Sequence, residues 1–287
     1  KGTSHPAISF VSGILLGILS AGNIILSVCV AGAAYTLKVI DAHKTLFLVN
    51  LSRIGSCLYI FLASFNLKLA ILLVMGLAGI SFALERPKKW QALMPLLFQL
   101  ALVLYGIQLI KTSADLLDDN PVVLNLIGYT QTYPWVSFLA GCFVMLLSQS
   151  LFASLVICIS FVGSDAFTTE EAILCVAGIY FMLALTRYLY LFAFDKNFRF
   201  AMSFIPCYYF IATGLTLILY FAQEYLFSLS QIMGPIAGLD PKNQLSWINF
   251  IIHIICSLGL HFFLSSFYPK QTKAPALVGA KKPSHIP

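Results

Sequence analysis

The chain has 287 residues, of which 60% are hydrophobic and only 10% charged, and its formal net charge is +6. This composition excludes a soluble globule, because a soluble chain of this length needs far more polar surface. The basic residues lie at the ends of apolar segments and in the C-terminal tail, as the positive-inside rule describes, so we expect no nucleic-acid partner. The seven cysteines form no CxxC pair and are typical of small buried apolar residues. We therefore predict an integral membrane protein without a cofactor or a metal centre.

Apolar segments of about 20 residues recur along the chain, and each is long enough to cross a hydrocarbon core of about 30 Å. They predict an all-α polytopic membrane protein. The expected spans are 45–65, 67–84, 90–110, 172–194, 200–222 and 247–268. Two further segments, 7–37 and 134–163, are about 30 residues long and are interrupted at the centre by small polar residues. A basic tail over 269–287 is predicted to be disordered.

The charges of the loops predict how the two long segments enter the membrane. Loops 85–89 and 195–199 and the tail hold most of the basic residues, which assigns them to the cytoplasm. Acidic or neutral loops are assigned to the outside, and these loops are 112–133, 165–171 and 223–245. Both ends of 134–163 then lie outside and both ends of 7–37 lie inside. Each long segment must dip in and return, so we predict two re-entrant hairpins from opposite faces.

Hairpins of opposite orientation are typical of inverted-topology repeats, and the sequence aligns with itself accordingly. Residues 10–13 (FVSG) align with 138–141 (FLAG), and the same gapless register places Ser20 on Ser148 and Asn50 on Gly178. We therefore predict a first repeat over 1–85, a second over 90–222, and an extra span over 247–268. The second repeat opens with span 90–110. Its counterpart would precede Lys1, so either this helix has been lost or the protein never had it.

Several motifs resemble the type II sodium–phosphate cotransporter family over residues 7–222. The family's leading helix is similar to LYGIQLI at 104–110, and its exit is similar to ADLL at 114–117. The family's QSSSAT hairpin motif is similar to QSLFAS at 149–154. Its GANIGT motif is similar to LVNLSR at 48–53 and to VAGIYF at 176–181. The resemblance implies sodium-coupled uptake of phosphate, or of another small anion or solute. It also implies alternating access to a mid-membrane site between the hairpin tips, with Na⁺ as the coupling ion.

A tetrahedral anion and dehydrated sodium ions need many donors and acceptors at mid-membrane. The candidate substrate-binding residues are Ser148, Gln149, Ser150, Ser154, Asn23, Asn50, Ser52 and Arg53. Sodium is expected near Gln149, Ser150 and Asn50. The first hairpin tip has few hydroxyls, so we predict a lopsided site rather than a symmetric one.

Each polar candidate also has a structural explanation. Arg53 lies deep in a span, where an arginine is costly, so it either binds an anion or snorkels or pairs with a helix C-terminus. For Arg187, near the end of a span, snorkelling is favoured. Asn23, Asn50 and Ser52 either line the site or hold helices together as small polar residues. His253 and His261 are expected to pack in the core or at the membrane interface.

Three functions follow from these patterns. The first is a secondary transporter, and the alternative is a transport-silent relative that acts as a membrane scaffold or partner subunit. A membrane-embedded enzyme is disfavoured, because HExxH, a Gly-rich phosphate loop and a nucleophile elbow are all missing from the sequence. A polar cavity lined by Gln149, Ser150, Asn23 and Arg53 would favour transport, and a dry centre filled by Leu151, Phe152, Ile24 and Ile25 would favour the scaffold.

The expected partners are the lipid bilayer and a small inorganic anion or other small solute, with a homo-oligomer as an open alternative. Short loops favour a bacterial inner membrane, and the loop charges place the C-terminal tail in the cytoplasm.

Overall fold

A computed structural model describes the chain over residues 6–20, 24–37, 40, 42–64, 68–84, 93–115, 121–163, 166–192, 203–225 and 239–267. These residues form helices and connecting turns, and none of them lies in a strand. The predicted all-α class is therefore confirmed. Three of the described helices contain segments long and apolar enough to cross a membrane, namely Thr169–Leu191, Phe204–Ala222 and Pro241–Leu260.

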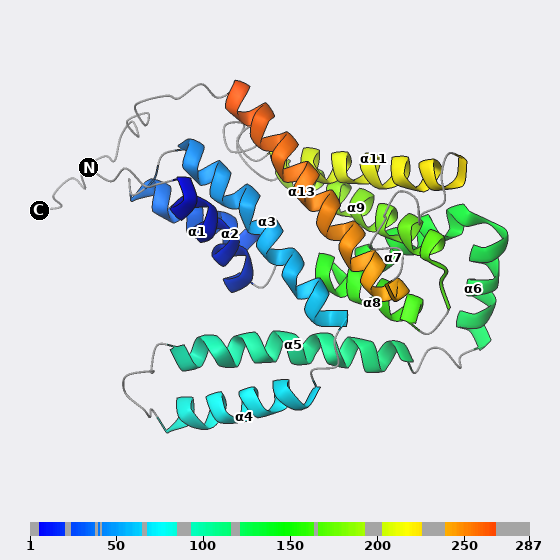
Figure 1. Cartoon of the computed structure of the whole chain (residues 1–287), viewed down its shortest axis with the longest axis horizontal. Helices are drawn as coiled ribbons and strands as arrows, with labels where there is room; N and C mark the ends of the chain where they lie inside the picture. The colour runs from blue at the N-terminus through cyan, green and yellow to red at the C-terminus, as the bar shows by residue number, and fades with distance from the viewer. Residues whose placement is uncertain are drawn as a thin grey trace, which may run out of the picture.

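The helices form three groups in space (Figure 1). The first group contains α1 (Pro6–Leu19), α2 (Ile24–Thr36) and α3 (Ala42–Ser64), and α4 (Lys68–Ala83) packs along α5 (Leu93–Asp115) below it. The third group contains α6 (Pro121–Thr132), α7 (Pro134–Ser148), α8 (Leu151–Gly163), α9 (Thr169–Leu191) and α11 (Phe204–Tyr225). Helix α13 (Pro241–Phe267) packs on α3 as well as on α8, α9 and α11, so it joins the first group to the third.

Each of the six predicted spans coincides with a helix, although some boundaries differ. We expected loops over 112–133 and 223–245, whereas 121–132 forms α6 and α13 begins at residue 241. Both helices start at a proline that follows Asn120 or Asp240 in the sequence. Proline is favoured in the first turn of a helix, because its missing N–H has no partner there anyway. Pro121 and Pro241 thus begin helices within segments that we expected to be loops.

Both long segments are divided at the predicted positions. Helix α7 ends at Ser148 and α8 begins at Leu151, and between them Gln149 takes a left-handed conformation with φ 50° and ψ 15°. The first segment is divided between Leu19 and Ile24. The resulting helices are each about 20 Å long, too short to cross a core of about 30 Å. Their entry into the bilayer as re-entrant hairpins remains a prediction.

In each long segment, the first helix packs across the span that follows the hairpin. At this crossing, each of the two helices has a glycine. A Cβ atom on Gly141 of α7 would lie 2.0 Å from the Cys175 carbonyl oxygen, and one on Gly178 of α9 would lie 2.0 Å from the Phe138 carbonyl oxygen. Both contacts are far shorter than any real Cβ contact, so the two backbones meet only because neither position has a side chain. Such small-residue crossings are a common way of packing membrane helices.

The crossing of α1 and α3 has the same reciprocal pattern. A Cβ atom on Gly17 would lie 1.9 Å from the Ser52 carbonyl oxygen, and one on Gly55 would lie 2.1 Å from the Ile14 carbonyl oxygen. These contacts make Gly17 the structural equivalent of Gly141. The sequence alignment paired Gly13 with Gly141 instead, so the two registers differ by about one helical turn. The crossing in the second unit therefore lies one turn further from its hairpin tip.

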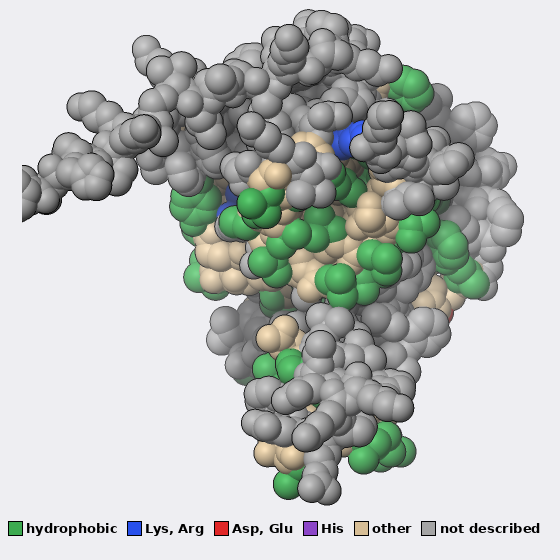
Figure 2. Space-filling view, turned by 90° about the vertical axis from the view of Figure 1, so that its left-hand side faces the viewer, with side chains coloured by type: hydrophobic (Ala, Val, Ile, Leu, Met, Phe, Trp, Pro, Cys, Tyr) green, Lys and Arg blue, Asp and Glu red, His purple; other side chains and the backbone are tan. Residues whose placement is uncertain are grey.

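The core is centred on α9, whose residues from Glu171 to Tyr180 are all buried against α7, α8, α11 and α13. Elsewhere the surface carries large apolar side chains, such as Leu69, which is 81% exposed, and Leu77, which is 63% exposed. Figure 2 shows hydrophobic side chains across much of the described part of one face. An apolar exterior of this kind fits contact with lipid rather than water.

Candidate functional site

The tip of the second hairpin brings four of the predicted site residues together. The hydroxyls of Ser148 and Ser154 lie 2.7 Å apart, and Ser154 also donates to the Ser150 carbonyl oxygen at 2.9 Å. Gln149 is exposed, and its Nε2 donates to the Leu146 carbonyl oxygen at 2.7 Å. The serine hydroxyls thus bond within the tip, whereas the Gln149 Oε1 atom accepts from the Tyr190 hydroxyl of α9 at 3.4 Å.

The first hairpin has a related contact. The Ser27 hydroxyl donates to the Ser20 hydroxyl at 2.9 Å, and Ser20 itself donates to the Gly17 carbonyl oxygen. Asn23, the predicted site residue at this tip, lies outside the described residues. Sequence reasoning missed Ser27 because it stands beyond the compared motif, three residues into α2. The spacing of Ser20 and Ser27 across a helix break, similar to that of Ser148 and Ser154, was the available signal.

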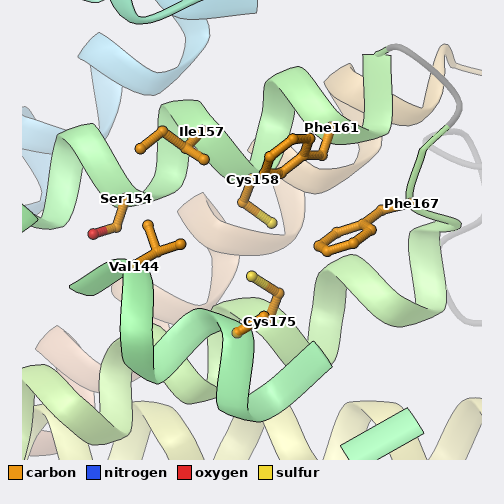
Figure 3. Close-up of a pocket in the computed structure, with 8 residues that line it drawn as sticks. Val144, Ser154, Ile157, Cys158, Phe161, Phe167 and Cys175 are labelled. Carbon is orange, nitrogen blue, oxygen red and sulfur yellow. The ribbon is translucent and has the colours of Figure 1, made fainter. Parts of the chain in front are cut away.

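Two cavities lie near the second hairpin, and neither is lined by Gln149 or Arg53. The smaller one, of about 20 Å³, is bounded mainly by apolar side chains of α7, α8 and α9, and within it the sulfur atoms of Cys158 and Cys175 face each other (Figure 3). The larger one, of about 220 Å³, is lined by Thr130, Pro134, Thr168, Glu170, Glu171, Leu174 and Tyr220. Leu151 and Phe152 pack against the core. The side chains of Ile24 and Ile25 lie outside the described part, and the tips enclose neither cavity.

Arg53 of α3 is buried, with 3% of its surface exposed, among aromatic rings of α11. Its guanidinium carbon lies 3.8 Å from the ring centroid of Tyr208, 5.1 Å from that of Tyr209 and 5.8 Å from that of Phe204. Its Nε, Nη1 and Nη2 atoms are all buried, and none has a hydrogen-bond acceptor among the described residues. The side chain is therefore neither snorkelling nor paired within that part of the chain.

Aromatic stacking does not replace the missing acceptors of Arg53. A cation–π contact contributes about 0.5–2 kcal/mol. Each buried polar group without a partner costs about 1–3 kcal/mol, and a charged group costs more. Three unsatisfied guanidinium nitrogens therefore outweigh the strong contact with Tyr208. An anion that filled the acceptor role would remove this cost.

Asn50, one turn before Arg53 on α3, links α3 to α13. Its Nδ2 donates to the Ser257 carbonyl oxygen at 2.6 Å, while the Ser257 hydroxyl donates to the Asn50 carbonyl oxygen at 3.3 Å. The Asn50 Oδ1 atom is buried without a donor among the described residues. Ser52 donates to the Val49 carbonyl oxygen at 2.7 Å, within its own helix. Asn50 thus holds two helices together and still has one acceptor atom unused.

A polar network that the sequence did not reveal surrounds His253 of α13. Its Nδ1 lies 2.5 Å from the Tyr208 hydroxyl and its Nε2 lies 3.3 Å from the Tyr180 hydroxyl, which in turn donates to Asn249 Oδ1. We expected His253 to be a packing residue. It does pack in the core, with both ring nitrogens engaged, but the network joins α9, α11 and α13, which no local spacing links. The side chain of His261 lies outside the described part.

Arg187 of α9 is the second cation of this region. It is half-buried, its guanidinium carbon lies 5.7 Å from the Tyr190 ring centroid, and its Nε is buried without an acceptor in the described part of the chain. Arg187, like Arg53, therefore packs against an aromatic ring.

The second unit has no equivalent of the polar face on α3. In the register of the glycine crossings, Asn50, Ser52 and Arg53 correspond to Ile173, Cys175 and Val176 of α9, which are all buried. The two spans therefore differ in polarity at the crossing, whereas the lopsided site expected at the hairpin tips stays a prediction.

One family model matches the chain. Its description is Na⁺/Pi-cotransporter, and the match covers residues 1–112, from α1 through most of α5. Comparisons with curated proteins and with solved structures find no match. The family match covers the unit that contains Asn50 and Arg53, whereas the hairpin motif that suggested the resemblance lies beyond it. Over its first 112 residues, the chain is thus similar to the Na⁺/Pi cotransporter family.

Proposed function

We propose that this protein is a secondary-active transporter that couples sodium to the uptake of phosphate or another small anion, with Arg53 as the principal anion contact. The match of residues 1–112 to the Na⁺/Pi-cotransporter family model supports sodium-coupled phosphate transport. The observation that carries the assignment to Arg53 is its burial without a described acceptor, beside three aromatic rings. An isolated buried cation in a membrane helix is costly and is therefore a functional candidate.

The transport cycle proposed is alternating access, with the binding site near mid-membrane between the two hairpins. In this conformation the hydroxyls at each tip bond to one another and Arg53 is buried, as in a closed state. In the open state of the proposed cycle, the hairpin tips would move away from the helices on which they pack. The anion could then reach Arg53. Of the three residues expected near sodium, Gln149 and Ser150 are proposed to bind the ion, because their carbonyl, amide and hydroxyl oxygens supply hard ligands.

The alternative is a transport-silent relative that acts as a scaffold or partner subunit. The observation in its favour is the packing of Leu151 and Phe152 against the core, together with the small apolar cavity of about 20 Å³ behind the second hairpin. A scaffold does not explain why Arg53 is buried without an acceptor among the described residues, so we favour transport. We further propose a bacterial inner-membrane location with a cytoplasmic C-terminal tail, and homo-oligomerisation stays an alternative.

Uptake of labelled phosphate into proteoliposomes, with and without an inward sodium gradient, tests this function. The intact protein should take up phosphate faster with the gradient, Arg53→Ala should abolish uptake, and Gln149→Ala should reduce sodium dependence. Empty liposomes provide the baseline. Phosphate uptake equal to that baseline would exclude phosphate as substrate, and uptake indifferent to sodium would exclude the coupling.

A further inference from the structure

Asn50 and Arg53 present complementary unused groups on one face of α3. They are three residues apart, and side chains at this spacing lie side by side on a helix. Asn50 is 1% exposed and Arg53 is 3% exposed. Within the described residues, Oδ1 of Asn50 has no donor, and Nε, Nη1 and Nη2 of Arg53 have no acceptor. A ligand that satisfied this pair would need negatively charged oxygens and at least one O–H donor.

The orientation of the Asn50 amide is fixed by its partner. The Ser257 carbonyl oxygen, 2.6 Å away, can only accept a hydrogen bond, so the amide nitrogen must face it. The unused atom is consequently the amide oxygen, which can only accept. Rotating the amide would place two acceptors against each other, so the ligand must supply the donor.

We propose that Asn50 is a specificity-determining residue that selects a protonated tetrahedral oxyanion. Its Oδ1 accepts a hydrogen bond from the P–OH group of hydrogen phosphate or dihydrogen phosphate, while the Arg53 guanidinium donates to the unprotonated oxygens. This assignment rests on the proposed role of Arg53 in anion binding. It leaves the sodium ion to Gln149 and Ser150 at the hairpin tip.

The proposal distinguishes phosphate from sulfate, which has nearly the same shape. Inorganic phosphate keeps at least one proton at neutral pH, whereas sulfate keeps none. Every oxygen of sulfate would face Asn50 Oδ1 as acceptor against acceptor, and the amide oxygen would stay buried without a partner. A site built around one hydrogen-bonding group of its ligand strongly rejects an analogue that lacks it. We expect a preference for phosphate over sulfate of about 100-fold or more.

Sodium is the competing occupant for Asn50 Oδ1. One amide oxygen is a weak site for a cation, and the positively charged guanidinium of Arg53 lies one turn away on the same helix face. The electrostatic repulsion favours a neutral O–H donor over Na⁺ at this atom. The two occupants predict different responses to salts, so a binding measurement separates them.

The experiment is the thermal unfolding of the purified full-length protein in detergent, with phosphate, sulfate or sodium added at matched ionic strength. A ligand that binds only the folded state raises the unfolding temperature, whether or not the protein transports it. Phosphate should stabilise the intact protein, and sulfate should do so only at concentrations about 100-fold higher. In Asn50→Leu the phosphate effect should weaken and the difference between the two anions should disappear.

Two further variants keep the test decisive if Asn50→Leu does not fold. Asn50→Asp keeps an acceptor for the ligand but loses the amide donor to the Ser257 carbonyl oxygen, so it should be less stable than the intact protein. It should still prefer phosphate to sulfate, although both bind more weakly beside the added negative charge. Asn249→Leu is the matched control, because Asn249 is also a buried asparagine but its Oδ1 already accepts from Tyr180. Its ratio of phosphate to sulfate affinity should equal that of the intact protein.

The outcomes separate this proposal from the proposed function. Equal stabilisation by phosphate and sulfate would overturn the role of Asn50 while leaving anion binding at Arg53 intact. No stabilisation by either anion would overturn anion binding itself, and the role of Asn50 with it. Stabilisation by sodium that is lost in Asn50→Leu but kept in Asn249→Leu would assign Oδ1 to the cation and overturn the proposal.

Discussion

The two hairpin-and-span units share their backbone contacts and differ in their chemistry. In each unit a glycine pair lets the first hairpin helix touch the carbonyl groups of the following span, and a pair of serines bonds across the helix break. The unit containing α1 to α3 has Asn50 and Arg53 beside its crossing. The unit containing α7 to α9 has Ile173 and Val176 there instead.

This comparison shows that the crossing and the binding groups follow different constraints. A glycine against a backbone carbonyl cannot be replaced without moving a whole helix, so it is set by packing. A polar residue next to the crossing can become apolar without disturbing the backbone, as long as the volume is filled. We infer that one unit supplies the anion contact and the other supplies core packing and an exposed polar tip.

The largest effect is expected from filling the crossings. Gly178→Ala places a Cβ atom 2.0 Å from a carbonyl oxygen of α7, and Gly55→Ala places one 2.1 Å from a carbonyl oxygen of α1. The two helices of each crossing must therefore separate. Each should destabilise the protein by about 3 kcal/mol or more. Thermal unfolding in detergent measures this loss. Gly259→Ala is the control, because a Cβ atom there meets nothing within 4 Å. A large loss in one unit only would show that the two crossings are not equivalent.

Replacing the buried cation should separate stability from binding. Arg53→Met removes an uncompensated charge and fills the space with apolar atoms, so it should stabilise the protein by about 1–4 kcal/mol while phosphate binding is lost. Unfolding temperature and equilibrium phosphate binding are measured on the same preparation. Val176→Ala, at the corresponding position of α9, should instead lower stability and leave phosphate affinity unchanged. A destabilised Arg53→Met would mean that Arg53 has a structural partner.

The serine pairs should have moderate and similar effects. Ser27→Ala and Ser154→Ala each remove one hydroxyl of a hydrogen-bonded pair, at 2.9 Å and 2.7 Å respectively. We expect each to cost about 1 kcal/mol, the usual value for such a bond between membrane helices. Unfolding temperature in detergent measures both. If only Ser154→Ala has an effect, the likeness of the two tips does not extend to their energetics.

The smallest effect is expected at Gln149, which has a positive φ of 50°. Glycine takes this conformation without steric cost, so Gln149→Gly should change stability by less than about 1 kcal/mol. It also removes the side chain proposed to lie near sodium, so the sodium dependence of uptake should fall while the fold is kept. Unchanged sodium dependence would remove Gln149 from the proposed cation site.

The sequence predicted the helical elements and the two helix breaks, because both follow from local patterns. Long apolar runs specify helices, and Ser148 to Ser150 interrupts one by offering hydroxyls to the backbone. The start of α6 at Pro121 was not predicted, because proline after polar residues suggests a loop as readily as a first helical turn. The register of the crossings differed by one turn, since a gapless alignment cannot represent hairpins of different length.

Sequence reasoning could propose site residues only where they lie together on one helix, and their role stays a prediction. Asn50, Ser52 and Arg53 became candidates together because they stand at the position of the GANIGT motif, and Arg53 also because an arginine deep in a span is unusual. Their partners could not be predicted in the same way. Tyr208 lies on α11 and Ser257 on α13, and only tertiary packing brings them to α3.

Equilibrium binding of radiolabelled phosphate to the purified protein tests the role of Arg53 most directly, because it does not depend on transport. The intact protein should bind phosphate saturably, Arg53→Lys should bind it more weakly because a lysine cannot donate in the planar, bidentate manner of a guanidinium, and Arg53→Gln should not bind it at all. Phosphate binding by Arg53→Gln with the affinity of the intact protein would contradict the account.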